Sequence, residues 1–166
     1  MILESRPLEG RRGHEAGRAL LAELYTRETG DPLPEIRIAE WGKPYFADSP
    51  WHFSISHTRR RVFVALSRHN IGIDAEELDR PLNLKLADKV LSPAERVQFD
   101  TAPDPHRALL TFWVLKEAEV KLSGTGLQGY PNQTNFTLPD PRVQEMDGCL
   151  VATLTEEETE GEIYAL

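Results

Sequence analysis

The sequence predicts an α+β fold, because its strand-like and helix-like segments occur in separate runs rather than in alternation. A helical pattern covers Glu15–Arg27, a series of β-rich runs follows up to Glu76, and a long helical pattern covers Pro105–Leu122. Strands grouped in this way beside separate helices favour small antiparallel sheets over a doubly wound parallel sheet.

The first helix is predicted over Glu15–Arg27, where Ala16, Leu20 and Leu24 recur at helical spacing. Gly30 and then Pro32 follow this segment, as is typical just beyond a helix end.

Four strands are predicted next. In Glu35–Trp41 two isoleucines alternate with polar residues, which is the pattern of a half-buried strand. The runs His52–His57, Val62–Ser67 and Ile71–Glu76 are rich in β-branched and apolar residues. Their connections are short enough for an antiparallel meander.

The pattern changes to helical at Ser92, which is placed to cap a helix with Pro93 in its first turn and Glu95 completing a capping box. The long helix over Pro105–Leu122 is expected to stop at Gly124. Weak strand signals follow in the tail, at Gly148–Leu154 and Ile163–Leu166.

The bulk properties indicate one soluble domain, residues 1–166, in the cytoplasm. The 166 residues are 40% hydrophobic and 28% charged, and the single cysteine, Cys149, has no internal partner for a disulfide. No stretch has the length of a membrane span, and the N-terminus lacks the apolar core of a signal peptide. The net charge of −8 argues against broad contact with nucleic acid.

Two carboxylates, Asp74 and Glu76, alternate with apolar residues at the end of a predicted strand and therefore share a face. Oxygen ligands side by side suit a hard cation such as Mg²⁺, which often shares its shell with substrate phosphates. The competing interpretation is an ordinary solvent-exposed strand edge.

On the long helix, Trp113, Glu117 and Lys121 are spaced four residues apart and line one stripe. Glu117 is either a third carboxylate near the metal or the base of the reaction, with Lys121 as a nearby positive charge. The alternative is a buried Trp beside a surface Glu–Lys pair worth only about 0.3–0.5 kcal/mol.

Ser54 and Ser56 share one face of the His52–His57 strand, whose end is a natural place to bind a phosphate. Ser56 and His57 point to opposite faces, so they are not expected to form a nucleophilic couple. The five histidines and one cysteine lack the spacing of zinc ligands.

Three motifs stand in one order along the chain, and together they resemble the 4′-phosphopantetheinyl transferase superfamily, in its longer, surfactin-synthetase-activating type. The resemblance covers Arg18 to Leu127. The motifs are Gly42-Lys43-Pro44 leading to Phe53-Ser54-Ile55-Ser56-His57-Thr58, then Ile71-Gly72-Ile73-Asp74-Ala75-Glu76, then Trp113-Val114-Leu115-Lys116-Glu117-Ala118 with Lys121 and Gly124-Thr125-Gly126-Leu127.

The resemblance implies two similar lobes, about residues 1–70 and 71–166, each with a small antiparallel sheet and a long helix and with coenzyme A between them. It implies Mg²⁺-dependent transfer of 4′-phosphopantetheine from coenzyme A to a serine of an apo acyl or peptidyl carrier protein. The implied metal ligands are Asp74, Glu76 and Glu117, and the implied catalytic residues are Glu117, Lys121 and Asp74. The implied coenzyme A contacts are Arg11, Arg12, Arg18, Lys43, Ser56 and His57.

Carrier proteins of this kind are acidic, as is this chain, so docking is expected to rely on an apolar patch and a local basic spot, with Arg59–Arg61 as the candidate. A monomer is expected. Two other functions stay open: a module that binds coenzyme A or a carrier protein without catalysis, and a hydrolase of nucleotide pyrophosphates.

Overall fold

The computed structural model describes residues 1–126 and 134–156. The elements in chain order are β1 (Ile2–Pro7), α1 (Gly13–Thr29), β2 (Ile36–Ile38), β3 (Pro44–Phe46), β4 (His52–His57), β5 (Arg61–Ser67), β6 (Ile71–Glu77), the 3-10 turn η1 (Leu84–Leu86), α2 (Ala87–Val90), α3 (Pro93–Asp100), α4 (Pro105–Ser123), β7 (Val143–Met146) and β8 (Cys149–Thr155).

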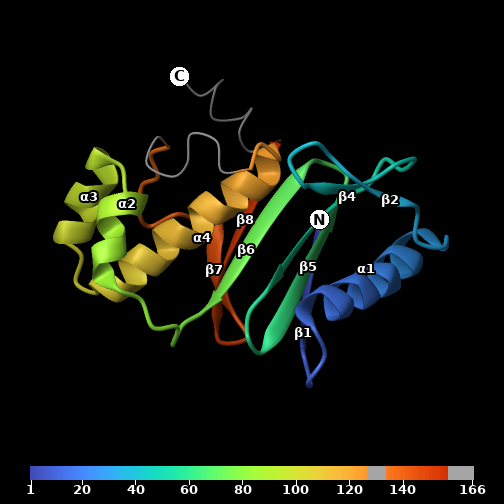
Figure 1. The fold of residues 1–166 in the computed structure, drawn as a ribbon, viewed down its shortest axis with the longest axis horizontal. Coiled ribbons are helices and arrows are strands. Elements are labelled where there is room, and N and C mark those ends of the chain that lie inside the picture. The colour runs from blue at the N-terminus through green and yellow to red at the C-terminus, as the bar shows by residue number, and fades with distance from the viewer. Residues whose placement is uncertain (127–133, 157–166) are drawn as a thin grey trace.

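The strands form two three-stranded antiparallel sheets and one small hairpin. The first sheet has the order β1-β5-β4, the second has the order β6-β8-β7, and β2 pairs with β3. The helix α1 lies beside the first sheet and α4 lies against the second (Figure 1). The mixed α and β composition with small antiparallel sheets, predicted from the sequence, is confirmed.

The predicted meander of three strands is wrong at its third member. β4 and β5 form an antiparallel hairpin, but β6 pairs with β8, so that Asp74 lies opposite Ala152. The short link 68–70 therefore carries the chain from one sheet to the other. The change of sheet follows from the side chains, because Ile71, Ile73 and Ala75 pack against Phe63 of β5 as a facing layer.

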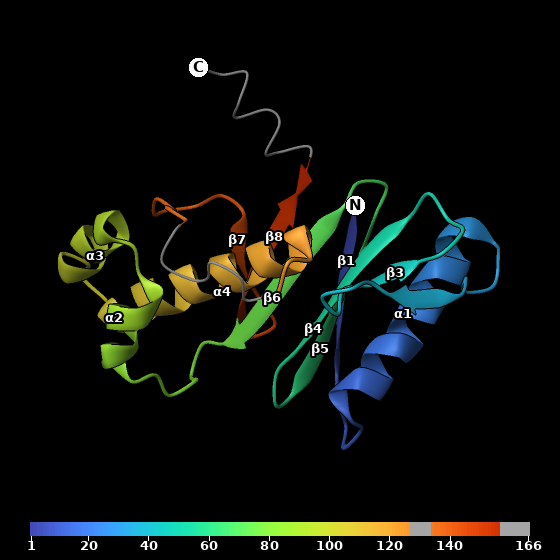
Figure 2. The same ribbon diagram turned by 45° about the horizontal axis from the view of Figure 1, so that its top comes forward.

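Alternation along β5 and β8 builds three apolar layers. The even residues from Val62 to Leu66 pack on α1, while Phe63 and Ala65 face the second sheet. On β8, Leu150 and Ala152 pack on α4, and the odd residues Cys149 and Val151 face the first sheet. The inner faces of the two sheets thus pack on each other, with one long helix outside each sheet. Figure 2 shows α1 and α4 on opposite sides of the strands.

The helix ends follow the predicted capping chemistry. Ser92 and Glu95 form the predicted capping box of α3, with Pro93 in the first turn. α1 and α4 are each followed by a C-cap glycine with left-handed backbone, Gly30 and Gly124. The predicted helices over Glu15–Arg27 and Pro105–Leu122 are confirmed within two residues at each end.

Four strands differ from the sequence-based expectations. β1, β3 and β7 were not predicted, and the Glu35–Trp41 strand is limited to Ile36–Ile38. The predicted strand Gly148–Leu154 corresponds to β8, whereas Ile163–Leu166 lies outside the described residues. Among the described residues, no helix has both the length and the apolar character needed to cross a bilayer.

Candidate active site

The candidate site lies where the edge of β4 meets β6, underneath α4. Gly72 of β6 makes this arrangement possible, because a Cβ atom there would lie 2.1 Å from the carbonyl oxygen of Ala118 and 2.4 Å from the amide nitrogen of Leu122. Any side chain at this position would push α4 away from the strand. The glycine therefore lets the C-terminal half of α4 pack directly onto β6, beside Asp74.

Asp74 is the centre of the site. Its Oδ1 accepts from Lys121 Nζ at 2.8 Å and from the Ser56 hydroxyl at 3.1 Å. Its Oδ2 is buried and has no hydrogen-bond partner within residues 1–126 and 134–156. Burial raises the pKa of this carboxyl above its ordinary value, while Lys121 and Ser56 act in the opposite direction. A buried carboxylate oxygen without a partner is costly, and it marks a position where a cation would be stabilised.

Glu76 lies two residues along β6 and shares the face of Asp74. Burial raises its pKa, the charge of Asp74 adds to that rise, and Arg80 opposes it. Arg80 forms an ion pair with Glu76, and its guanidinium lies 5.5 Å from the ring centre of Trp113. The predicted carboxylate pair is therefore adjacent in space, as the strand alternation required.

Arg80 was not found from the sequence, although it belongs to the site. It lies in the loop after β6, four residues beyond Glu76, where sequence alone gives no indication of which way a loop side chain turns. Its only signal was a positive charge shortly after two carboxylates.

His57 and Glu76 line one cavity of about 580 Å³ together with Arg80. His57 also packs against the first residue of α1, because a Cβ atom on Gly13 would lie 2.4 Å from the imidazole ring. The structure thus brings the N-terminal end of α1 next to the cavity that contains Glu76. An N-terminal helix end favours anions, as do the donors around it.

Three predicted phosphate contacts lie on or before the first turns of α1. Arg11 and Arg12 are exposed, and Arg12 is the N-cap residue, while Arg18 is half-buried one and a half turns later. None of the three side chains has a hydrogen-bond or ion-pair partner among the described residues. These guanidinium groups are therefore available to an anion, and their role as coenzyme A contacts stays a prediction.

Lys43 lies at the other side of the site, where its ammonium is bonded to the end of α4. Its Nζ donates to the carbonyl oxygen of Leu122 at 2.7 Å and to Asn70 Oδ1 at 2.5 Å. Burial lowers the pKa of Lys43 to about 8. Lys43 and Lys121 line a second hollow of about 270 Å³. Lys43 thus fastens the Gly-Lys-Pro turn to α4, and a phosphate contact would compete with these bonds.

Glu117 is half-buried on α4, one helical turn before Lys121. In the described ranges, no three His, Cys, Asp or Glu side chains are grouped as a metal site. The donor set nevertheless fits Mg²⁺, because Asp74 Oδ2 lacks a partner among the described residues and the Glu76 carboxyl lies beside it. The place of Glu117 in that set stays a prediction.

The basic run Arg59–Arg61 was predicted as a docking spot, and each of its guanidinium groups is paired within the chain. Arg59 pairs with Glu77 at 3.2 Å, Arg60 with Asp79 at 3.0 Å, and Arg61 with Asp147 at 3.1 Å. A carrier protein would have to compete with these pairs, so the charge offered to a partner is reduced.

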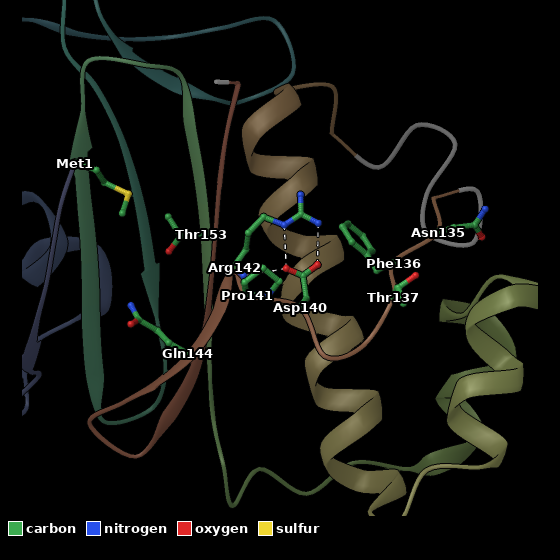
Figure 3. Close-up of a pocket in the computed structure, with 9 residues that line it drawn as sticks. All are labelled: Met1, Asn135, Phe136, Thr137, Asp140, Pro141, Arg142, Gln144 and Thr153. Carbon is green, nitrogen blue, oxygen red and sulfur yellow. Dashed lines mark hydrogen bonds and ion pairs between the residues drawn. The ribbon is translucent and has the colours of Figure 1, made fainter. Parts of the chain in front are cut away.

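A larger cavity, of about 690 Å³, lies away from these residues and is drawn in Figure 3. The two charged residues that line this cavity, Asp140 and Arg142, form an ion pair with each other at 2.8 Å. No predicted site residue lines the cavity. Size alone therefore does not identify the site, and the smaller cavity is the one that His57, Glu76 and Arg80 line.

Comparison with known proteins identifies a family and several relatives. A family model described as the 4′-phosphopantetheinyl transferase superfamily matches residues 70–160, more than half of the chain. The 4′-phosphopantetheinyl transferase AcpT of Escherichia coli K12 is 39% identical over 66% of this chain and 56% of its own. The 4′-phosphopantetheinyl transferase gsp of Aneurinibacillus migulanus is 32% identical over 68% of this chain and 51% of its own. The 4′-phosphopantetheinyl transferase Sfp of Bacillus subtilis 168 is 33% identical over 67% of this chain and 51% of its own.

The chain spans about half the length of the curated relatives that it matches. The matched region contains β6 and the whole of α4, which carry Asp74, Glu76 and Lys121. The resemblance drawn from the sequence motifs is therefore confirmed, and the chain belongs to the 4′-phosphopantetheinyl transferase superfamily.

Proposed function

We propose that this chain transfers the 4′-phosphopantetheine group from coenzyme A to a serine of an apo acyl or peptidyl carrier protein, in a Mg²⁺-dependent reaction. The serine oxygen forms a bond to the phosphorus attached to pantetheine, and the bond from that phosphorus to the bridging pyrophosphate oxygen breaks. Adenosine 3′,5′-bisphosphate is released. The family membership and the names of the relatives support this reaction.

The observation that carries the proposal is the buried Oδ2 of Asp74, which lies beside Glu76 and has no hydrogen-bond partner in the part of the chain that the structure describes. Asp74, Glu76 and Glu117 would hold the Mg²⁺. When bound, the metal would neutralise charge on the pyrophosphate oxygens and on the leaving group. The two long helices and their sheets would form two lobes, about residues 1–70 and 71–166, with coenzyme A between them.

Lys121 is suited to stabilise charge that develops during the transfer. Its ammonium lies 2.8 Å from Asp74 Oδ1, and its side chain is 32% exposed, so further donors are open to a phosphate oxygen. A preorganised cation at that position is worth more to the transition state than to the ground state. Glu117, one turn earlier on α4, would accept the proton from the carrier serine.

The phosphates of coenzyme A would lie against the start of α1. His57 lines the same cavity as Glu76, and Arg11, Arg12 and Arg18 lie just before or within the first turns of α1. Backbone N–H groups at a helix start and guanidinium groups together suit an anion such as the 3′-phosphate.

Intact-mass spectrometry tests the proposal directly. An apo carrier protein is incubated with this protein, coenzyme A and Mg²⁺, and a phosphopantetheine-sized mass gain on the carrier is expected, which a chelator should prevent. Coenzyme A cleaved without carrier modification would instead indicate a pyrophosphate hydrolase. Binding of coenzyme A without either reaction, across several acyl and peptidyl carriers, would indicate a binding module.

A further inference from the structure

Two serines of β4 face the same edge of β6 and perform the same structural task. The Ser54 hydroxyl accepts from the amide of Ile73, and the Ser56 hydroxyl accepts from the amide of Ala75, both at 3.0 Å. The two side chains are 7% and 4% exposed. Along this edge of β6, side-chain oxygens thus replace the backbone carbonyls of a sheet ladder, and both hydroxyls satisfy a buried amide.

The two serines differ in where the hydroxyl proton points. Ser56 donates to Asp74 Oδ1 at 3.1 Å, whereas Ser54 makes no contact with a carboxylate among the described residues. A serine hydroxyl has one proton to donate. Ser56 therefore cannot donate to a phosphate oxygen while it holds Asp74.

The contact decides which oxygen of Asp74 remains available. Ser56 and Lys121 both donate to Oδ1, and Oδ2 is the oxygen left buried without a partner in residues 1–126 and 134–156. We infer that Ser56 is a positioning residue, which fixes the orientation of the Asp74 carboxylate so that Oδ2 is presented to a divalent cation. This inference rests on the proposed function, and it gives Ser56 a role through Asp74 in place of a direct phosphate contact.

Outer contacts of this kind orient metal ligands, and their loss typically weakens metal binding by about 10–100-fold. Ser54 supplies a matched control, because Ser54→Ala removes a buried hydroxyl from the same strand edge and leaves an amide of β6 without its acceptor, as Ser56→Ala does. The two variants should thus lose similar stability and differ only in the contact with Asp74.

The experiment measures Mn²⁺ binding to the full chain by electron paramagnetic resonance, with coenzyme A at saturation, for the wild type and both variants. Urea unfolding of each protein is recorded in parallel. Ser56→Ala is expected to raise the Kd for Mn²⁺ by about 10–100-fold, while Ser54→Ala leaves it within about twofold, and both shift the urea midpoint similarly. Should Ser56→Ala not fold, Ser56→Cys keeps the volume with a weak donor and is measured in its place.

Equal Mn²⁺ affinity in the two variants would overturn the inference. So would a Ser56→Ala protein that binds Mn²⁺ normally but has a raised KM for coenzyme A, since that result would indicate a direct phosphate contact. In both cases a wild type that modifies its carrier leaves the proposed function standing. A wild type that neither binds Mn²⁺ nor modifies any carrier overturns the proposed function, and this inference with it.

Discussion

Two lysine–carboxylate pairs on α4 have almost the same length and different surroundings. Lys116 Nζ lies 2.9 Å from Glu95 Oε2, and both side chains are fully buried. Lys121 Nζ lies 2.8 Å from Asp74 Oδ1, with 32% and 9% of the side chains exposed. Because the two ion-pair distances are almost equal, the pairs are distinguished by the other hydrogen bonds that their carboxylates make.

The first pair is saturated. Glu95 accepts from the amide of Ser92 on Oε2 and from the amide of Phe136 on Oε1, and Lys116 also donates to the carbonyl oxygen of Thr134. These bonds tie the segment at residues 134–136 to α3 and α4. A buried ion pair with all its partners present specifies how neighbouring elements meet.

The second pair is unsaturated, because Asp74 Oδ2 has no partner in the part of the chain that the structure describes. Natural proteins rarely leave such an oxygen buried without a reason. One helix thus carries a lysine whose carboxylate partner is fully hydrogen-bonded and, five residues later, a lysine whose carboxylate partner has an oxygen without a partner among the described residues. What distinguishes them is the remaining capacity of the partner carboxylate.

The largest expected effect is on stability. Lys116→Met leaves the buried Glu95 charge without its cation, so the free energy of unfolding should fall by about 3–5 kcal/mol. Urea unfolding measures this. The double variant Lys116→Met/Glu95→Gln removes both charges and should recover part of the loss. A loss below about 1 kcal/mol in the single variant would contradict the assignment of this pair to the fold.

Asp74→Asn should lower the transfer activity without lowering the stability. Transfer to the carrier should fall by roughly 10³-fold, as for loss of a principal electrostatic contact in an active site. The free energy of unfolding should stay unchanged or rise, because burial raises the pKa of Asp74 and thus disfavours its charged form. Glu145→Gln removes an exposed carboxylate from β7 and controls for net charge. Retained transfer in Asp74→Asn would remove Asp74 from the site.

Lys121→Met should lower turnover by roughly 10²-fold and weaken coenzyme A binding much less, because its role is assigned to the transition state. Its loss of unfolding free energy should be smaller than that of Lys116→Met, since Lys121 is partly exposed. Steady-state kinetics and a coenzyme A titration separate the two effects. An equal loss in turnover and in binding would assign Lys121 to ground-state binding.

The smallest effect concerns Lys43 and the pH dependence of stability. Burial lowers its pKa to about 8 from an ordinary value of 10.5, so in this window the unfolded chain binds a proton that the folded chain does not. Stability should therefore gain a rising contribution between about pH 8 and 10.5. Lys43→Met should remove that contribution. Urea midpoints of both proteins at pH 8 and pH 10 test this. An equal change of the midpoint with pH in the two proteins would contradict the prediction.

Local chemistry made much of the fold predictable. The Ser92–Glu95 capping box, the glycine ends of the long helices and the alternation of Asp74 with Ile73 all act within one turn or one strand pair. Such features depend on neighbours in the sequence, and the structure confirms them. β1 was missed because it carries no clear alternation in a short, charged segment.

The sheet partner of β6 was not predictable in the same way. A strand pattern shows that one face is buried, but not which strand lies beside it. β6 pairs with β8, which lies some 80 residues later in the chain, and Asp74 is opposite Ala152. Arg80 and the hydroxyl direction of Ser56 depend on that same long-range packing.

The sequence by itself determined the family, the residue types of the site and the face of β6 that carries Asp74 and Glu76, because motif order and strand alternation are local properties. Only the tertiary structure decided that Lys121, 47 residues from Asp74, donates to one oxygen of its carboxylate, while the other oxygen has no partner in the described part of the chain. The physical reason is Gly72, whose missing side chain lets α4 contact the β6 backbone and sets the distance between helix and strand.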